Sequence, residues 1–157
     1  MQSVEQAISC GGRGDCMRAT IASLLDLELE AVPHFILLPE HLWNYVLTMF
    51  LWSLGWSYEG CMSYSKTESN ILNMEDSFNG YFYASVPSRN FEGKTHAVVI
   101  NINGVVIHDP SPTKKYQGEN VIETGSICYW YLVKRREDTE WKSWSNKLYS
   151  TEKEKTK

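Results

Sequence analysis

The chain has 157 residues, of which 43% are hydrophobic and 22% are charged, a balance typical of one globular domain. Its formal charge of −4 disfavours nucleic acid as the main partner, because a duplex-binding surface carries a positive field. The longest apolar stretch, residues 42–56, contains polar interruptions and is shorter than the ~20 apolar residues of a membrane span. We therefore expect no association with a membrane.

The first residues and the cysteines indicate the compartment. Residues 1–5 contain neither a basic region nor an apolar region, so we expect no secretory signal and a cytoplasmic protein with reduced thiols. A Cys10–Cys16 disulfide is an alternative for an oxidising environment. The cysteines form no CxxC pair and no zinc-binding spacing, so we expect neither a metal nor another cofactor: Cys10, Cys16, Cys61 and Cys128.

The N-terminal third predicts helices. A glycine-rich turn over residues 9–14 precedes Asp15, which stands in the position of an N-cap, and a helix is predicted from Cys16 to Leu27. A short helix is predicted over residues 29–32. Pro39 can occupy the first turn of a third helix over residues 40–54, and Gly55 is suited to ending it.

The remainder of the chain predicts strands. They cover residues 56–62, 81–86, 95–102, 105–109, 121–122 and 127–133, with an ambiguous segment at 63–78 that includes a possible helix over 68–74. Helices followed by antiparallel strands indicate an α+β fold in which N-terminal helices pack on an antiparallel sheet. We expect one domain over residues 1–140 and a charged C-terminal tail over residues 141–157.

Cys16 stands at the first turn of the first predicted helix. The nucleophile in thiol chemistry is the thiolate, and a free cysteine has a pKa of about 8.5. Unpaired N–H groups and the helix dipole lower that pKa at a helix start, and the Cys16 backbone N–H could donate to an oxyanion. The alternative is a buried structural cysteine. To act as a nucleophile, Cys16 needs a base.

A predicted hairpin supplies that base. Asn103-Gly104 predicts a two-residue turn, which pairs Ile102 with Val105, Ile100 with Ile107 and Val98 with Asp109. Because side chains alternate along a strand, His96 and Asp109 then share one face and lie diagonally, at ~7–8 Å between backbones. We expect His108 on the opposite face, with Val99 and Val106. A base and the carboxylate that orients it require such a pair.

Each residue also has an ordinary explanation. His96 could be a surface histidine at a strand start, and Asp109 could belong to an Asp-Pro turn at a strand end. Their predicted common face, together with a cysteine at a helix start, favours a catalytic group over three coincidences.

The order of these motifs resembles the papain-like cysteine peptidase superfamily. The similarity is greatest to bacteriocin-processing, double-glycine-type peptidases and to uncharacterised phage and bacterial cysteine-peptidase-like proteins, so a phage-encoded protein is one expectation. It extends from residue 6 to about residue 116. The segments that carry it are Gly14-Asp15-Cys16-Met17-Arg18-Ala19 with Ile21-Ala22-Ser23-Leu24-Leu25, then His96-Ala97-Val98-Val99, and Val106-Ile107-His108-Asp109-Pro110.

The resemblance implies a papain-like fold and a role for each matching residue. Cys16 would be the nucleophile, His96 the general base and Asp109 the residue that orients the imidazole. Members of this superfamily use an upstream Gln as an oxyanion donor, which here would be Gln6, together with the Cys16 N–H. Gln6 precedes Cys16 by ten residues rather than about six, and residues 9–12 can absorb the difference.

Three functions are compatible with this reading. The first is a cysteine hydrolase that cleaves a peptide, isopeptide or other amide bond in a protein or peptide substrate through a thioester acyl-enzyme. The second is an acyltransferase with the same three residues, in which an amine captures the acyl group. The third is a non-enzymatic binding or inhibitor protein on an inherited fold, since a fold does not fix a function.

Overall fold

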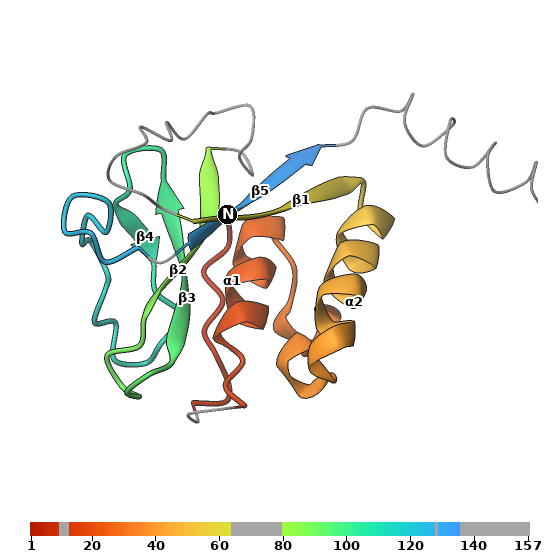
Figure 1. Ribbon diagram of the computed structural model, residues 1–157, viewed down its shortest axis with the longest axis horizontal. Helices are drawn as coiled ribbons and strands as arrows, with labels where there is room; N and C mark the ends of the chain where they lie inside the picture. Colours follow the sequence, from red (N-terminus) through yellow and green to blue (C-terminus); the bar gives the residue numbers. More distant parts are fainter. Residues whose placement is uncertain (10–12, 64–79, 128, 136–157) are drawn as a thin grey trace, which may run out of the picture.

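The computed structural model describes residues 1–9, 13–63, 80–127 and 129–135 and has an α+β architecture (Figure 1). Five strands form an antiparallel sheet in the order β1-β5-β2-β3-β4. The helices are α1 (Cys16–Leu25) and α2 (Glu40–Ser53), with 3-10 turns η1 (Leu29–Ala31) and η2 (Phe35–Leu37) between them. The strands are β1 (Trp56–Ser63), β2 (Tyr81–Pro87), β3 (Thr95–Asn101), β4 (Val106–His108) and β5 (Tyr129–Arg135).

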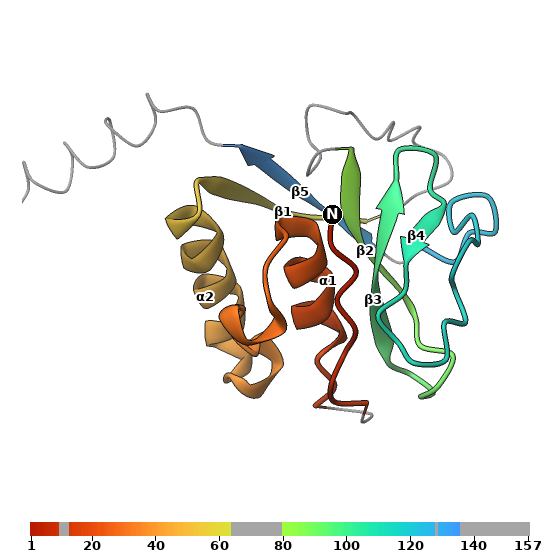
Figure 2. The same cartoon turned by 180° about the vertical axis from the view of Figure 1, so that it is seen from behind.

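The helices cover one face of the sheet. In Figures 1 and 2, α1 lies between α2 and β3, and α1 contacts β2 and β3 while α2 contacts β1. The α1 residues Ala19 and Ala22 are fully buried, and such small side chains allow a helix to approach a sheet closely. One apolar core joins the helices to the sheet face that Tyr83, Ala97 and Val99 present.

A long loop, residues 109–127, covers the other face. Tyr116, Val121 and Ile127 of this loop are buried against Val98 and Ile100 of β3 and form a second apolar core. Because side chains alternate along β3, the strand contributes to both cores and is buried on both faces. The start of β3, which carries His96, is thereby fixed between two packed layers.

Helix α1 differs from its prediction at both ends. It ends at Leu25 rather than Leu27, because Asp26 adopts a left-handed conformation (φ 54°) and the Leu27 N–H donates to the Ala22 carbonyl. At the start, the prediction of Asp15 as a side-chain cap is wrong. Asp15 occupies the N-cap position, but its carboxylate makes no hydrogen bond to the helix.

The hairpin between β3 and β4 forms, but its predicted register is wrong near the turn. The loop has three residues with Gly104 left-handed (φ 78°), because the Asn101 N–H donates to the Val105 carbonyl and the Asn101 side chain accepts the Val105 N–H. Ile100 therefore pairs with Val106 instead of Ile107.

A bulge in β4 then restores the predicted register. The pairing shifts between Ile100 and Val99, so that Val99 faces His108 and Ile107 is the extra residue. His108 lies on the predicted side with Val99. The prediction for Val106 is wrong, because it packs in the core on the opposite face. Beyond the bulge the chain reaches Asp109 in the predicted alignment.

The other predictions are confirmed only in part. No strand forms at residues 121–122, where the side chain of Asn120 accepts the N–H groups of Ile122 and Glu123 in a turn. The predicted helix over 68–74 and the tail over 141–157 lie outside the described residues. Within the described ranges, no helix combines the length and apolar character that a membrane crossing requires.

Candidate active site

The structure brings Cys16, His96 and Asp109 together, although they are distant in sequence. Cys16 is the first residue of α1, His96 is the second residue of β3, and Asp109 follows β4 directly. The His96 Nε2–H donates to Asp109 Oδ1 at 2.7 Å, and Cys16 and His96 line one cleft, in which His96 lowers the pKa of the Cys16 thiol. Because Nε2 is used by Asp109, Nδ1 is the ring nitrogen left for the sulfur.

The electrostatics of Cys16 and His96 favour a thiolate–imidazolium pair. Burial opposes ionisation of Cys16, but hydrogen bonds from His96 and the Ala97 N–H, the charge of His96 and the Met17 N–H outweigh it and lower the pKa of the thiol. Burial also opposes protonation of His96. Hydrogen bonds to Asp109 and Cys16 and their negative charges outweigh it and raise the pKa of His96 to about 9. The shifts have opposite directions, as proton transfer from sulfur to imidazole requires.

Asp109 is held as a buried carboxylate with several donors. Its side chain is 1% exposed. Burial alone would raise its pKa, but the hydrogen bond from His96 and the N–H groups of Tyr116 and Ser111 lower it. The Ser111 N–H donates to Oδ1 at 2.9 Å and the Tyr116 N–H to Oδ2 at 3.0 Å. Both carboxylate oxygens are thus fixed, which also fixes the plane of the His96 ring.

Asp15 has a role that the sequence reasoning missed. Its fully buried carboxylate accepts the backbone N–H groups of Ala7 at 3.2 Å and Ile8 at 2.9 Å, and its own N–H donates to the Ile8 carbonyl. The residue directly before Cys16 therefore binds the N-terminal segment to the start of α1. A helix-cap pattern gives no indication of such a long-range role.

The same N-terminal segment, residues 4–8, runs alongside α1 in Figures 1 and 2. The Val4 N–H donates to Ser23 of α1, and the His108 Nε2–H donates to the Val4 carbonyl. The Gln6 N–H donates to the Pro110 carbonyl at 3.0 Å. The segment thus joins the helix that carries Cys16 to the turn that carries Asp109.

Gln6 lies in the lining of the same cleft as Cys16 and His96, as an oxyanion donor would. Its amide group, however, is not aimed as the resemblance implies. The Nε2–H donates to the Ile8 carbonyl at 3.2 Å, and Oε1 is buried with no hydrogen-bond partner among the described residues. By contrast, no hydrogen bond of the described residues uses the Cys16 N–H. Within the described ranges, this backbone donor has no acceptor.

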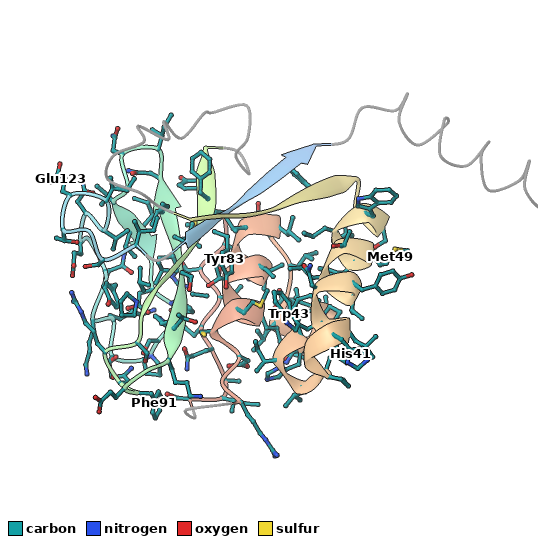
Figure 3. All side chains as sticks on the ribbon, in the orientation of Figure 1. His41, Trp43, Met49, Tyr83, Phe91 and Glu123 are labelled. Atoms are coloured by element: carbon teal, nitrogen blue, oxygen red, sulfur yellow. The ribbon has the colours of Figure 1, made fainter. Side chains whose placement is uncertain are left out.

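A cleft of about 260 Å³ opens at the N-terminal end of α1. Figure 3 shows Trp43 and Phe91 on opposite sides of that end, with Trp43 on α2 and Phe91 on the turn between β2 and β3. The cleft has an apolar side that includes Met17, Ile36 and Trp43, and a polar side near the start of β3 that includes Lys94 and Thr95. Cys16 lies in the lining with both.

The other cysteines of the chain lie outside the described part, at least in their side chains. Cys16 has a free thiol, while Cys10 and Cys128, and the side chain of Cys61, lie outside the described residues. In the described part of the chain, no group of three or more His, Cys, Asp or Glu side chains has the arrangement of a metal site. His41 is exposed and does not line the cleft.

Comparison with known proteins adds no further identification. A scan against protein-family models finds no matching family, and searches of curated proteins and of solved structures find no match. The functional interpretation therefore rests on the geometry of Cys16, His96 and Asp109.

Proposed function

We propose that the protein is a cysteine hydrolase of the papain-like type, acting on a peptide, isopeptide or other amide bond in a protein or peptide substrate. The observation that carries the proposal is the His96–Asp109 hydrogen bond at an open cleft that Cys16 and His96 line together. A structural cysteine needs neither an imidazole nor a carboxylate behind that imidazole.

The chemistry proceeds through an acyl-enzyme. The Cys16 thiolate attacks the substrate carbonyl, and His96, protonated at Nδ1, gives its proton to the leaving amine as the C–N bond breaks. A thioester to Cys16 remains. His96 then takes a proton from water, the resulting hydroxide attacks the thioester, and the Cys16 thiolate is released with the acid. Asp109 holds the ring and stabilises its positive charge throughout.

The developing oxyanion needs donors. The Cys16 N–H supports this role because it lies at a helix start, where it has no intrahelical partner. Gln6 can supply the second donor after rotation of its amide, which would exchange the positions of Nε2 and the unpartnered Oε1. Substrate binding would provide the compensating hydrogen bond.

Selective alkylation tests the nucleophile. Iodoacetamide should modify Cys16 faster than the other three cysteines at mildly acidic pH, and mass spectrometry of proteolytic fragments measures all four in one sample. The His96→Ala variant should remove this selectivity, since the thiol then returns toward its ordinary pKa. Equal labelling of the four cysteines, with a rate that rises only at alkaline pH, would contradict the proposal.

Activity on a mixture of internally quenched peptides tests the reaction. The Cys16→Ala variant should be inactive, and His96→Ala should lose about 10²–10⁴-fold in kcat. Adding a primary amine separates hydrolysis from acyl transfer, because a transferase yields the amide at the expense of the acid. If the Cys16→Ala and His96→Ala variants keep the biological effect of the wild-type protein, that result would instead indicate a binding protein.

A further inference from the structure

The charge distribution in the cleft indicates a substrate preference. Among the described residues that line it, Lys94 is the only Lys or Arg, and none is Asp or Glu. The whole chain carries a formal charge of −4, so this local positive charge contrasts with its surroundings. Lys94 is exposed, and no ion pair joins it to another described residue.

The backbone directs Lys94 to the side of the cleft where His96 lies. The Lys94 carbonyl accepts the Ser88 N–H at 2.7 Å, which continues the pairing of β2 with β3 beyond Thr95. In an extended chain, residues two apart project to the same side, at about 6.5 Å between Cα atoms. Lys94 and His96, two residues apart, both line the cleft.

The general-acid role proposed for His96 indicates which part of the substrate lies beside Lys94. A general acid must reach the leaving nitrogen, so the leaving segment occupies the His96 side of Cys16. The acyl segment then extends toward the apolar side with Ile36 and Trp43. Lys94 is thus adjacent to the leaving segment.

The part of the cleft wall that carries Phe91 and Lys94 is also attached to the loop over residues 109–127. The Arg89 side chain donates to the Lys115 carbonyl at 2.6 Å, pairs with Glu119 at 2.7 Å and stacks 3.9 Å from the centre of the Tyr116 ring. The Tyr116 hydroxyl donates to the Pro87 carbonyl at 2.7 Å. Such attachment to the loop that holds Asp109 lowers the entropic cost of ordering this wall on binding.

We infer that Lys94 is a specificity-determining residue that selects a carboxylate in the leaving segment of the substrate, close to the scissile bond. This inference rests on the proposed function for the identity of the leaving segment. The carboxylate can belong to an Asp or Glu side chain or to a free C-terminus, and both present the same anion to the ammonium group.

Two alkylating reagents of similar size test the electrostatic effect of Lys94 at Cys16. This test requires no known substrate. Iodoacetate is anionic and iodoacetamide is neutral, so the ratio of their rates with Cys16 reports the local charge. At low salt, Lys94→Gln should lower this ratio about two- to fivefold, and Lys94→Glu should lower it further. Glu123→Gln is the control, because it also changes the formal charge by one at an exposed residue that does not line the cleft, and it should leave the ratio unchanged.

Peptides then test specificity directly. Amidated quenched peptides with Glu, Gln or Lys in the leaving segment, and a Gln peptide with a free C-terminus, distinguish the two carboxylate sources. Wild type should favour an anionic peptide over the Lys peptide, and Lys94→Glu should reverse that order. An unchanged order and an unchanged reagent ratio in both Lys94 variants would overturn the inference. A lowered ratio without cleavage of any peptide would support Lys94 and contradict the proposed hydrolysis.

Discussion

The Asp15 carboxylate accepts the Ile8 N–H at 2.9 Å and so joins the residue before Cys16 to the segment that carries Gln6. Asp15 is fully buried, and the same carboxylate accepts the Ala7 N–H. The position of Gln6 at the cleft thus depends on a side chain at the start of α1.

Replacing Asp15 should therefore reduce both stability and reactivity. Asp15→Ala leaves two backbone donors without an acceptor, and we expect a loss of about 2–3 kcal/mol in the free energy of unfolding. Asp15→Asn should lose less, because one amide oxygen remains as an acceptor. Urea denaturation measures the change. Glu28→Ala is the control, since Glu28 is exposed and should change stability by less than about 0.5 kcal/mol.

Stability should fall at alkaline pH because His96 becomes neutral. Its pKa is raised to about 9 in the folded protein, so its stabilising effect is complete below its ordinary pKa of about 6.5 and is lost as pH rises through about 9. The contribution lost is about 3–4 kcal/mol. Urea denaturation between about pH 7 and pH 10 measures it, with His96→Phe as the reference. Equal slopes for the two proteins would contradict the raised pKa.

Asp109→Asn should separate the effect of the Asp109 charge on His96 from the effect of its side-chain shape. The amide keeps an acceptor for the His96 Nε2–H, but it removes the negative charge and presents an N–H₂ group to donors such as the Tyr116 N–H. We expect the pKa of His96 to move down toward its ordinary value and kcat to fall about 10²-fold. Proton NMR titration of the His96 ring measures the pKa. Asp26→Asn, at the exposed end of α1, should change neither quantity.

The loop of the hairpin gives a prediction about folding alone. Gly104 has φ 78°, and a Cβ atom there would lie 2.6 Å from side-chain atoms of Ile122, whereas Gly118, with φ 80°, has open space. Gly118→Ala should cost about 1–2 kcal/mol for its conformation. Gly104→Ala should cost about 1–3 kcal/mol more for overpacking.

A second substitution separates the two contributions at Gly104. In thermal denaturation, Ile122→Ala should recover the overpacking part of the Gly104→Ala loss, because it removes the atoms that the new Cβ meets. Alkylation of Cys16 should keep its wild-type rate in Gly104→Ala. A slower rate there would show that the loop and the site are coupled.

The sequence predicted the positions of Cys16, His96 and Asp109 better than it predicted the residues that hold them in place. Cys16 was recognisable because a glycine-rich turn and a helix start are local signals, and the contact of His96 with Asp109 follows from strand alternation. The roles of the three residues stay predictions. The two-residue turn was wrong because the Asn101 side chain closes a three-residue loop, and the bulge at Ile107 happened to compensate.

The supports of the site depend on contacts that periodicity does not encode. Asp15 binds backbone groups seven and eight residues earlier, and Tyr116 reaches Asp109 through its own N–H. One local signal was available. In Asp109-Pro110-Ser111, the Ser111 N–H donates to Asp109 Oδ1, a short-range turn that Asp favours two residues before such a donor.

The N-terminal segment has a consequence for when the thiol becomes reactive. The bonds from His108 to Val4 and from Gln6 to Pro110 each close a span of 104 residues, and contacts of such high sequence separation form slowly during folding. A chain emerging from the ribosome would carry Cys16 before His96 and Asp109 had even been synthesised. During synthesis the Cys16 thiol would therefore have the low reactivity of an ordinary cysteine. It would become reactive only after the contacts between the N-terminal segment and residues 108–110 had formed.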